Sequence, residues 1–278
     1  MVAKPAGPTS HDVVDIVRRA LGQTRVGHLG TLDPFAEGLL VMVVGRATRL
    51  APYAAGWRKS YEGLIRLGAV TTTDDRTGEV TVTSDAWKAL DGAAVGEACA
   101  ALTGEIEQRP PAFSAVKVGG ERAYRRARRG ETMAMAPRRV TVFELAVLDW
   151  RPPDIRFRAT VSGGTYLRSL ARDLGERLGT GGHLAELTRT RVGPFGLEDA
   201  VAPQALTPAD LKDPVLLVAD LPHRVLEGAE REMIVHGRPI AGPEFEGGSI
   251  ALMADGGLLG VGEAGGGLIK PRLVLADA

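Results

Sequence analysis

The chain has 278 residues, a length that suits one large and one small domain or two domains of medium size. Its 34 basic and 34 acidic residues give a net charge of zero, which taken alone argues against a polyanionic partner. The single cysteine, Cys99, excludes an internal disulfide and disfavours a thiolate metal cluster. Residues 1–5 lack the apolar core of a signal peptide, and no apolar run approaches the length of a membrane span. We therefore expect a cytoplasmic protein that does not associate with membranes.

The charge is distributed unevenly along the chain. Residues 117–139 carry eight basic and two acidic side chains, a local net charge of +6. Residues 201–278 carry six basic and eleven acidic side chains, a net charge of −5. A local basic patch on a neutral protein can still bind phosphates.

The N-terminal part of the chain predicts a helix, a loop and a strand. Thr9 and Asp12 have the spacing of a capping box, and apolar residues then recur at helical spacing over 10–21 until Gly22. Residues 27–38 contain several glycines and a proline, which forbid regular structure. The apolar run 39–44 then predicts a buried strand. Asp33 therefore lies on an irregular loop next to a rigid core, where catalytic side chains are often presented.

Strands and helices intermix further along the chain. Alternation predicts strands over 60–67, 79–83, 140–150 and 155–161. Helical spacing predicts helices over 91–102 and 167–178. Residues 105–131 are rich in proline and then in arginine, and we interpret them as an excursion from the core.

The sequence pattern changes after the Pro- and Asp-rich segment 203–222. Short strands are predicted over 249–253, 258–261 and 268–275, separated by Gly-rich turns. These strands predict a small all-β module at the C-terminus. The whole chain is therefore predicted to be an α+β protein of two domains.

The residues alone leave the chemistry open. The five histidines form no metal-binding motif, although a pairing of His28 with Asp33 is conceivable, and no phosphate loop, dinucleotide fingerprint or nucleophilic serine motif occurs. A lone carboxylate remains, and Asp33-Pro34 is also a common opening of a turn. A nearby arginine such as Arg168 would keep a buried carboxylate ionised, but on spacing alone it is a solvated helix residue. Tyr61 and Tyr166 fit core aromatics as well as base-stacking groups.

An ordered set of motifs resembles one family. The match begins at residue 4 and ends near residue 195. Its parts are Lys4-Pro5-x-Gly7-x-Thr9-Ser10-His11-Asp12, Gly27-His28-x-Gly30-Thr31-Leu32-Asp33-Pro34-x-Ala36-x-Gly38, Gly45-Arg46-Ala47-Thr48-Arg49, Lys59-Ser60-Tyr61, Gln108-x-Pro110-Pro111-x-Phe113-Ser114-Ala115-x-Lys117, Tyr124-x-x-Ala127-Arg128-x-Gly130, Gly163-Gly164-Thr165-Tyr166-Leu167-Arg168, and Leu187-x-Arg189. This set resembles the bacterial TruB family of tRNA pseudouridine(55) synthases.

The resemblance implies a fold, partners and a reaction. It implies a catalytic domain over 1–222, with a mixed, mainly antiparallel central sheet flanked by helices and a thumb insertion over about 105–132. It also implies a small C-terminal β-barrel module over 223–278, similar to a PUA RNA-binding domain. The reaction would be the isomerisation of uridine 55 in the tRNA T-arm, by an enzyme without cofactor or metal. Such an enzyme is expected to be a monomer with no obligate protein partner.

The resemblance also implies roles for single residues. Asp33 would be the nucleophile, attacking either C1′ of the sugar or C6 of the base, and Arg168 would hold it ionised. Tyr61 would stack on the flipped base and is also a candidate to take the C5 proton. The remaining expected substrate contacts are His28, Tyr166, Leu187, Lys117, Arg125, Arg126, Arg128 and Arg129, the last five of them to phosphates of the thumb-bound T-arm.

Two other hypotheses are weaker. An RNA-binding protein or tRNA folding chaperone would not need Asp33, Tyr61 and Arg168 together. An unrelated hydrolase that used Asp33 would need a second carboxylate or a metal set, and neither is evident.

Overall fold

A computed structural model of the chain describes residues 1–114, 117–118, 121–122, 126, 129, 131, 135–242 and 247–275. The chain divides into two compact units, and neither is one continuous segment. Unit 1 consists of Met1–Val13, Gly30–Val41 and Gly56–Pro203. Unit 2 consists of Val14–Leu29, Met42–Ala55 and Gln204–Ala278.

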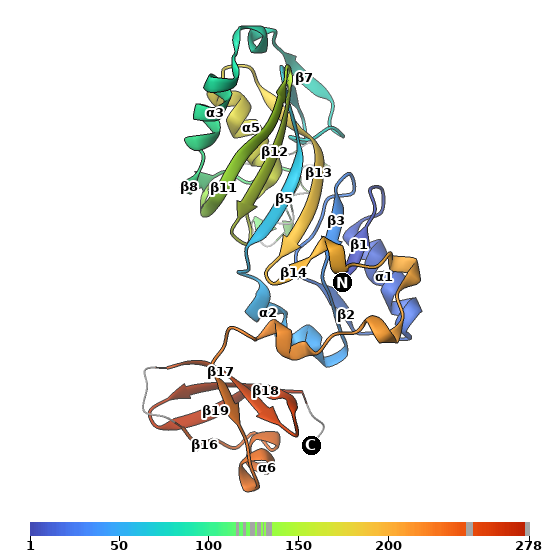
Figure 1. The fold of residues 1–278 in the computed structure, drawn as a ribbon, viewed down its shortest axis with the longest axis vertical. Helices are drawn as coiled ribbons and strands as arrows, with labels where there is room; N and C mark the ends of the chain where they lie inside the picture. The colour runs from blue at the N-terminus through green and yellow to red at the C-terminus, as the bar shows by residue number, and fades with distance from the viewer. Residues whose placement is uncertain are drawn as a thin grey trace. The chain divides into compact units, whose positions relative to one another are not determined.

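An eight-stranded sheet forms the centre of unit 1, in the order β1-β3-β13-β5-β12-β11-β8, with β14 paired to β13 (Figure 1). All of its neighbouring strands are antiparallel except β3 and β13, which are parallel. The strands are β1 (Val2–Lys4), β3 (Glu37–Leu40), β13 (Gly182–Val192), β5 (Lys59–Leu67), β12 (Asp154–Val161), β11 (Arg138–Arg151), β8 (Gly104–Gln108) and β14 (Phe195–Gly196). The α+β class and the mixed, mainly antiparallel sheet are therefore confirmed.

One face of this sheet is apolar and covered by helices. Along β5 the buried positions alternate, so that Tyr61, Ile65 and Leu67 share the face that joins the main core. Helices α3 (Gly92–Ala100) and α5 (Leu167–Arg177) pack against β11 and β13 (Figure 1). Asp91 begins α3 by accepting a hydrogen bond from the backbone of Ala94.

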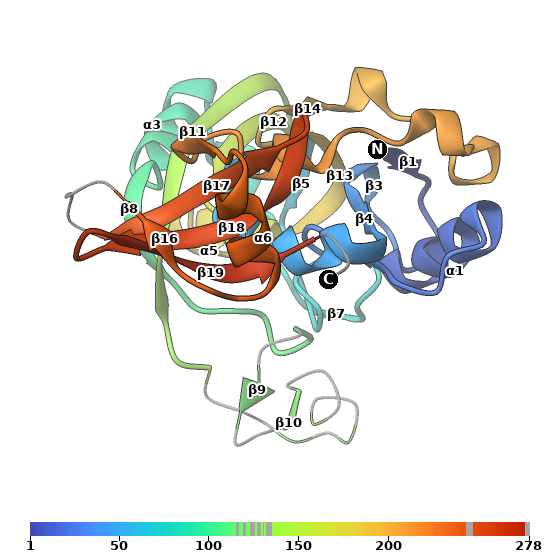
Figure 2. The ribbon, with the colours of Figure 1, turned by 90° about the horizontal axis from the view of Figure 1, so that it is seen from below.

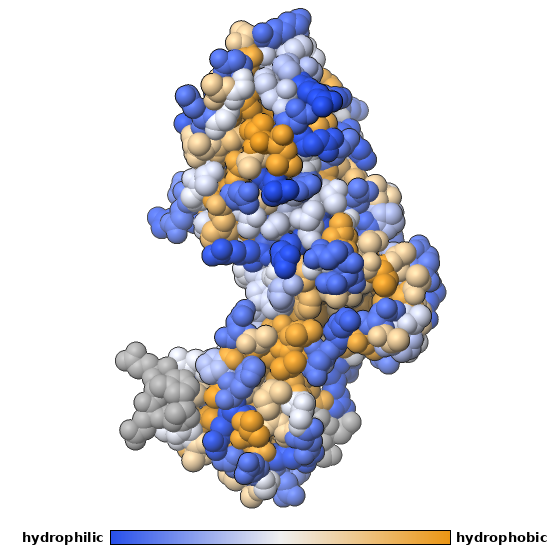
Figure 3. Space-filling model, viewed as in Figure 1, coloured by the Kyte–Doolittle hydropathy of each residue, from blue (hydrophilic) through white to orange (hydrophobic). Residues whose placement is uncertain are grey.

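The other face of the sheet is more exposed and carries charged side chains beside some apolar ones. Cross-strand ion pairs join Arg66 to Asp154 and Arg158 to Glu62, each at 2.7 Å. In the view of Figure 3, hydrophilic side chains surround an apolar patch on the face of unit 1 that is turned to the viewer. The buried chemistry of unit 1 therefore lies on the helix-covered face.

The strand prediction for 39–44 is wrong in one respect. The run is divided into β3, which pairs with β1 and β13, and β4 (Met42–Val44), which pairs with β2 (Val26–His28). A single apolar run therefore serves two sheets. Helix α1 (Ser10–Leu21) matches its prediction, and Thr9 and Asp12 form the expected capping box.

Unit 2 contains a curled five-stranded sheet in the order β15-β17-β18-β19-β16, and α6 (Ala229–Val235) packs against it (Figure 2). Its strands are β15 (His223–Val225), β17 (Gly248–Ala254), β18 (Gly257–Gly265), β19 (Leu268–Val274) and β16 (Ile240–Ala241). The small C-terminal β module is thus confirmed. Its proposed boundary at residue 222 stays a prediction.

Two arginines fasten the last strand of unit 2. They extend from the 3₁₀ turn Gly45–Leu50, which precedes the short helix α2 (Ala51–Ala54). Arg46 donates to the carbonyl of Leu275 at 2.5 Å, and Arg49 donates to that of Val274 at 2.7 Å. Among the described residues, no helix is long and apolar enough to cross a membrane.

Candidate active site

Asp33 lies on the loop 30–36 of unit 1, directly before β3. Gly30 and Gly38 frame this loop with φ angles of +96° and +103°, which side-chain-bearing residues rarely adopt. A side chain at Gly38 would also collide with the backbone of Arg189 on the neighbouring β13. The two glycines therefore allow the backbone turns at both ends of the loop, and Gly38 allows β3 to lie close to β13.

Three buried polar side chains hold the loop by its backbone. Lys4 donates to the carbonyls of Ala36 at 2.6 Å and Pro34 at 3.4 Å. Ser10 exchanges hydrogen bonds with both backbone groups of Leu32, at 2.9 and 3.0 Å. The side chain of Arg189, which is fully buried, donates to the carbonyls of Leu39 at 2.7 Å and Gly30 at 3.0 Å.

Sequence reasoning did not find these roles. Lys4 and Arg189 occur within the recognised motifs, but nothing local in the sequence distinguishes a buried clamp from a surface cation. The one available signal for Lys4 is that it ends a strand directly before Pro5.

Arg168 and Asp33 form an ion pair, as the resemblance implied. Nε of Arg168 lies 2.8 Å from Oδ2 of Asp33, and Nη2 donates to Oδ1 at 3.1 Å. The Arg168 side chain is only 6% exposed, whereas the Asp33 side chain is 34% exposed. The carboxylate is therefore open to an incoming ligand, and its cation lies behind it.

A second carboxylate shares the same arginine. Asp75, in the turn between β6 (Ala69–Thr71) and β7 (Val80–Thr83), has Oδ2 3.5 Å from Nη1 of Arg168. Its other oxygen accepts hydrogen bonds from Thr73 and from the backbone and hydroxyl of Thr77. The polar residues 71–78 give no local signal of an arginine partner, so sequence reasoning missed Asp75.

Backbone carbonyls complete the surroundings of Arg168. Nη1 donates to Thr73 at 3.0 Å, and Nη2 donates to Phe113 at 2.9 Å. The guanidinium is thereby fixed from the β6–β7 turn and from the start of the excursion after β8. Its orientation toward Asp33 does not depend on a ligand.

The electrostatic balance at Asp33 is unfavourable to its charge. Burial raises the pKa of Asp33 above its ordinary value, Arg168 opposes the rise, and Asp75 adds to it. A carboxylate with weakened solvation and a fixed counter-ion is suited to act as a nucleophile.

Tyr61 and Leu187 lie in the apolar cluster that also contains Leu32, Phe35 and Ala36 of the Asp33 loop. They come from the neighbouring strands β5 and β13. Tyr61 is 6% exposed and Leu187 is 7% exposed. Tyr61 is therefore a core aromatic, and the core that contains it borders on the Asp33 loop.

Tyr166 precedes α5 and is held from two sides. The fully buried amide of Gln108 accepts a hydrogen bond from its backbone nitrogen at 2.8 Å and donates to its carbonyl at 3.1 Å. The Arg138 guanidinium lies 4.4 Å from the centre of its ring. Gln108 therefore fixes the start of the helix that carries Arg168.

The other expected contacts are only partly described. His28 is in β2 of unit 2. Lys117 is in β9 (Lys117–Val118), which pairs with β10 (Glu121–Arg122). Arg126 and Arg129 both pair with Glu131, at 2.6 and 2.8 Å. Arg125 and Arg128 lie outside the described residues.

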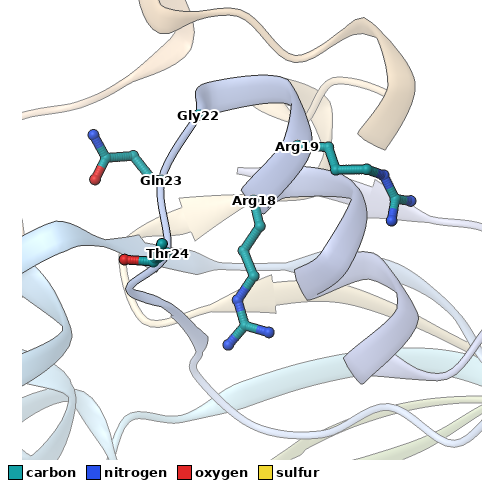
Figure 4. A pocket seen from close by; sticks show the side chains of 5 residues that line it. All are labelled: Arg18, Arg19, Gly22, Gln23 and Thr24. Atoms are coloured by element: carbon teal, nitrogen blue, oxygen red, sulfur yellow. The ribbon is translucent and has the colours of Figure 1, made fainter.

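Metal-binding clusters and the surface pocket add no further candidate site among the described residues. Among the residues that the structure describes, no group of three or more histidine, cysteine or acidic side chains could hold a metal ion. The surface pocket in Figure 4 lies at the end of α1 and contains no predicted site residue. Its lining consists of Arg18, Arg19, Gly22, Gln23 and Thr24.

Comparison with known proteins identifies the family. Residues 18–167 match the TruB family pseudouridylate synthase N-terminal domain, and residues 168–226 match the tRNA pseudouridylate synthase B C-terminal domain. The tRNA pseudouridine synthase B of Thermobifida fusca (strain YX) is 49% identical over 100% of this chain and 98% of its own length. That of Mycobacterium sp. (strain KMS) is 46% identical over 100% and 96%.

Solved structures share the fold. A chain in the crystal structure of a Cbf5–Nop10–Gar1 complex has a TM-score of 0.74 and 26% identity, covering 99% of this chain and 84% of that one. A chain in an H/ACA RNP bound to a substrate RNA containing 2′-deoxyuridine has a TM-score of 0.72 and 24% identity, over 99% and 84%. By its matched domains and its full-length relatives, the chain belongs to the TruB family of pseudouridine synthases.

Proposed function

We propose that this chain isomerises uridine 55 in the T-arm of tRNA to pseudouridine, without a cofactor, and that Asp33 is the nucleophile. The relatives named tRNA pseudouridine synthase B support the substrate. The observation that carries the catalytic assignment is the partly exposed Asp33 carboxylate backed by the buried, immobilised Arg168.

The reaction needs no outside reagent. The uridine is extruded from its loop, because its glycosidic bond is unreachable inside the stack. Asp33 attacks either C1′ of the ribose or C6 of the base, and the N1–C1′ bond breaks. The base turns, a C5–C1′ bond forms, and Asp33 leaves. The proton lost from C5 is balanced by the proton gained at N1, so the product is an isomer.

The remaining residues position the base and the RNA. Tyr61 stacks on the extruded base, which offsets part of the unstacking cost at roughly 1–3 kcal/mol per base, and is a candidate acceptor for the C5 proton. Leu187 and Tyr166 line the same site, and His28 contacts the T-loop. The thumb over 105–132, with Lys117, Arg125, Arg126, Arg128 and Arg129, meets phosphates of the T-arm.

The chain organisation follows from the same proposal. Residues 1–222 catalyse the reaction, and residues 223–278 add RNA contacts. The enzyme acts in the cytoplasm as a monomer without an obligate protein partner.

The test is release of tritium from tRNA labelled at uridine C5. Asp33→Asn should abolish release and still bind tRNA, because the amide keeps the shape of the side chain but is not a nucleophile. Asp85→Asn is the control, since that carboxylate is 77% exposed and pairs with Lys88 at the surface. Undiminished release by Asp33→Asn refutes the nucleophile. Release from a labelled tRNA with cytidine at position 55 refutes the target position.

A further inference from the structure

Lys59 is a buried cation that the reaction described above does not use. It begins β5, is 8% exposed, and shares a strand face with Tyr61 two residues later. Side chains two residues apart on a strand are about 7 Å apart. Lys59 therefore lies beside the base site, on the face that the Asp33 loop covers.

The ammonium of Lys59 is almost without partners. Its Nζ donates to the carbonyl of Trp57 at 3.1 Å, which uses one of three hydrogens. Among the residues that the structure describes, no carboxylate pairs with it. Its strand neighbours at Val161 and Val192 carry no charge, and the charged group facing it is the fully buried Arg189. Burial, with help from Arg189, lowers the pKa of Lys59 to about 8.

A purely structural role does not require this charge. Burying an ammonium costs free energy unless it is paired, and a methionine would fill the same space more cheaply. Within the described part of the chain, neither Lys59 nor Arg189 forms an ion pair with a carboxylate, so the two cations make an incomplete site that an anion would complete.

Gly30 covers this pair with bare backbone. A Cβ at Gly30 would lie 3.1 Å from Cε of Lys59 and 3.5 Å from Nη1 of Arg189. Its φ of +96° also excludes most other residues. The same loop reaches Asp33 three residues later, so an RNA strand that delivers a base to Asp33 passes close to Gly30.

We propose that Lys59, supported by Arg189, binds a backbone phosphate of the substrate RNA next to the extruded nucleotide. Phosphate is the anionic group of an RNA strand, whereas uracil and ribose are neutral at physiological pH. The site rests on the proposed function, since it requires an RNA substrate with its target base at Asp33. It would draw the strand down over Gly30 as the base enters.

The experiment compares Lys59→Met, Lys59→Arg and the wild-type protein. Binding of a T-arm stem-loop is measured against salt concentration, with Lys88→Met as the control for an exposed lysine. Lys59→Met should weaken binding about tenfold and reduce the slope of log K against log salt by ~0.7–0.9, the value for one lost phosphate contact. Lys59→Arg should restore most of the affinity, and Lys88→Met should match the wild type.

A pH series provides a second readout that does not depend on how well Lys59→Met folds. Wild-type binding should weaken between pH 7 and pH 9 as Lys59 loses its proton, and Lys59→Arg should show a flatter profile. If Lys59→Met binds RNA with the affinity and salt slope of the wild type, the proposed phosphate site is wrong. Turnover by Asp33→Asn would instead overturn the reaction, so the two failures are distinguishable.

Discussion

Replacement of Arg189 by methionine tests whether the Asp33 loop depends on its buried clamp. The guanidinium makes hydrogen bonds of 3.0 Å or less to the carbonyl of Gly30 in the loop and to that of Leu39 in β3, and it has no exposed surface. Hydrogen bonds to charged groups contribute roughly 1.5–3 kcal/mol each. Methionine removes both and leaves the carbonyls unsatisfied, but it also removes a buried charge. We expect a net loss of about 3–5 kcal/mol in the free energy of unfolding.

The assay uses the tryptophans, which all lie in unit 1. Trp57, Trp87 and Trp150 make fluorescence in urea a measure of the unfolding of this unit alone. Turnover is then measured at a temperature where the variant is folded, and it should fall because Asp33 is no longer held against Arg168.

Arg191→Met is the matched control on the same strand. A register shift between residues 189 and 191 places Arg191 in solvent, where it is 54% exposed and 4.0 Å from Glu198. Its loss should cost less than about 0.5 kcal/mol. If the free energy of unfolding of Arg189→Met lies within 1 kcal/mol of the wild-type value and turnover is unchanged, Arg189 does not hold the Asp33 loop and the reasoning fails.

Two further predictions concern buried groups near the helices of unit 1. Gln108→Leu removes both hydrogen bonds to the backbone of Tyr166, and should cost about 2–4 kcal/mol in the same urea assay and raise KM; an unchanged midpoint and KM would contradict it. Cys99 is 2% exposed and burial raises its thiol pKa to about 11, so a thiol reagent should modify it only in urea. Rapid labelling of the native protein would contradict this.

The parts of the fold predicted from sequence are those with a local signature. The alternation from Tyr61 to Leu67 predicts β5 because one face of that strand is buried and the other is not. The central strand β13 was not predicted as a strand. Its sequence mixes buried leucines with arginines, and buried Arg189 resembles a surface residue until its carbonyl partners are known.

The same distinction applies to the site. Asp33 and Arg168 were paired through the resemblance, since 135 residues separate them and no spacing rule connects them. Asp75 was missed because an aspartate that only caps a turn and one that also pairs with a distant arginine can have the same neighbouring residues. Long-range polar contacts are set by tertiary structure, which has no periodic trace in the chain.

The position of β13 in the chain has a consequence for synthesis on the ribosome. Asp33 is made early, but Arg168 and the clamp at Arg189 are made more than 130 residues later. Both strands that pair with β5, namely β12 and β13, are also synthesised after it. A nascent chain that ends before residue 189 therefore has an open sheet edge and a loose Asp33 loop. We therefore expect the Asp33 site to assemble late in synthesis and in a single step, when β13 inserts between β3 and β5.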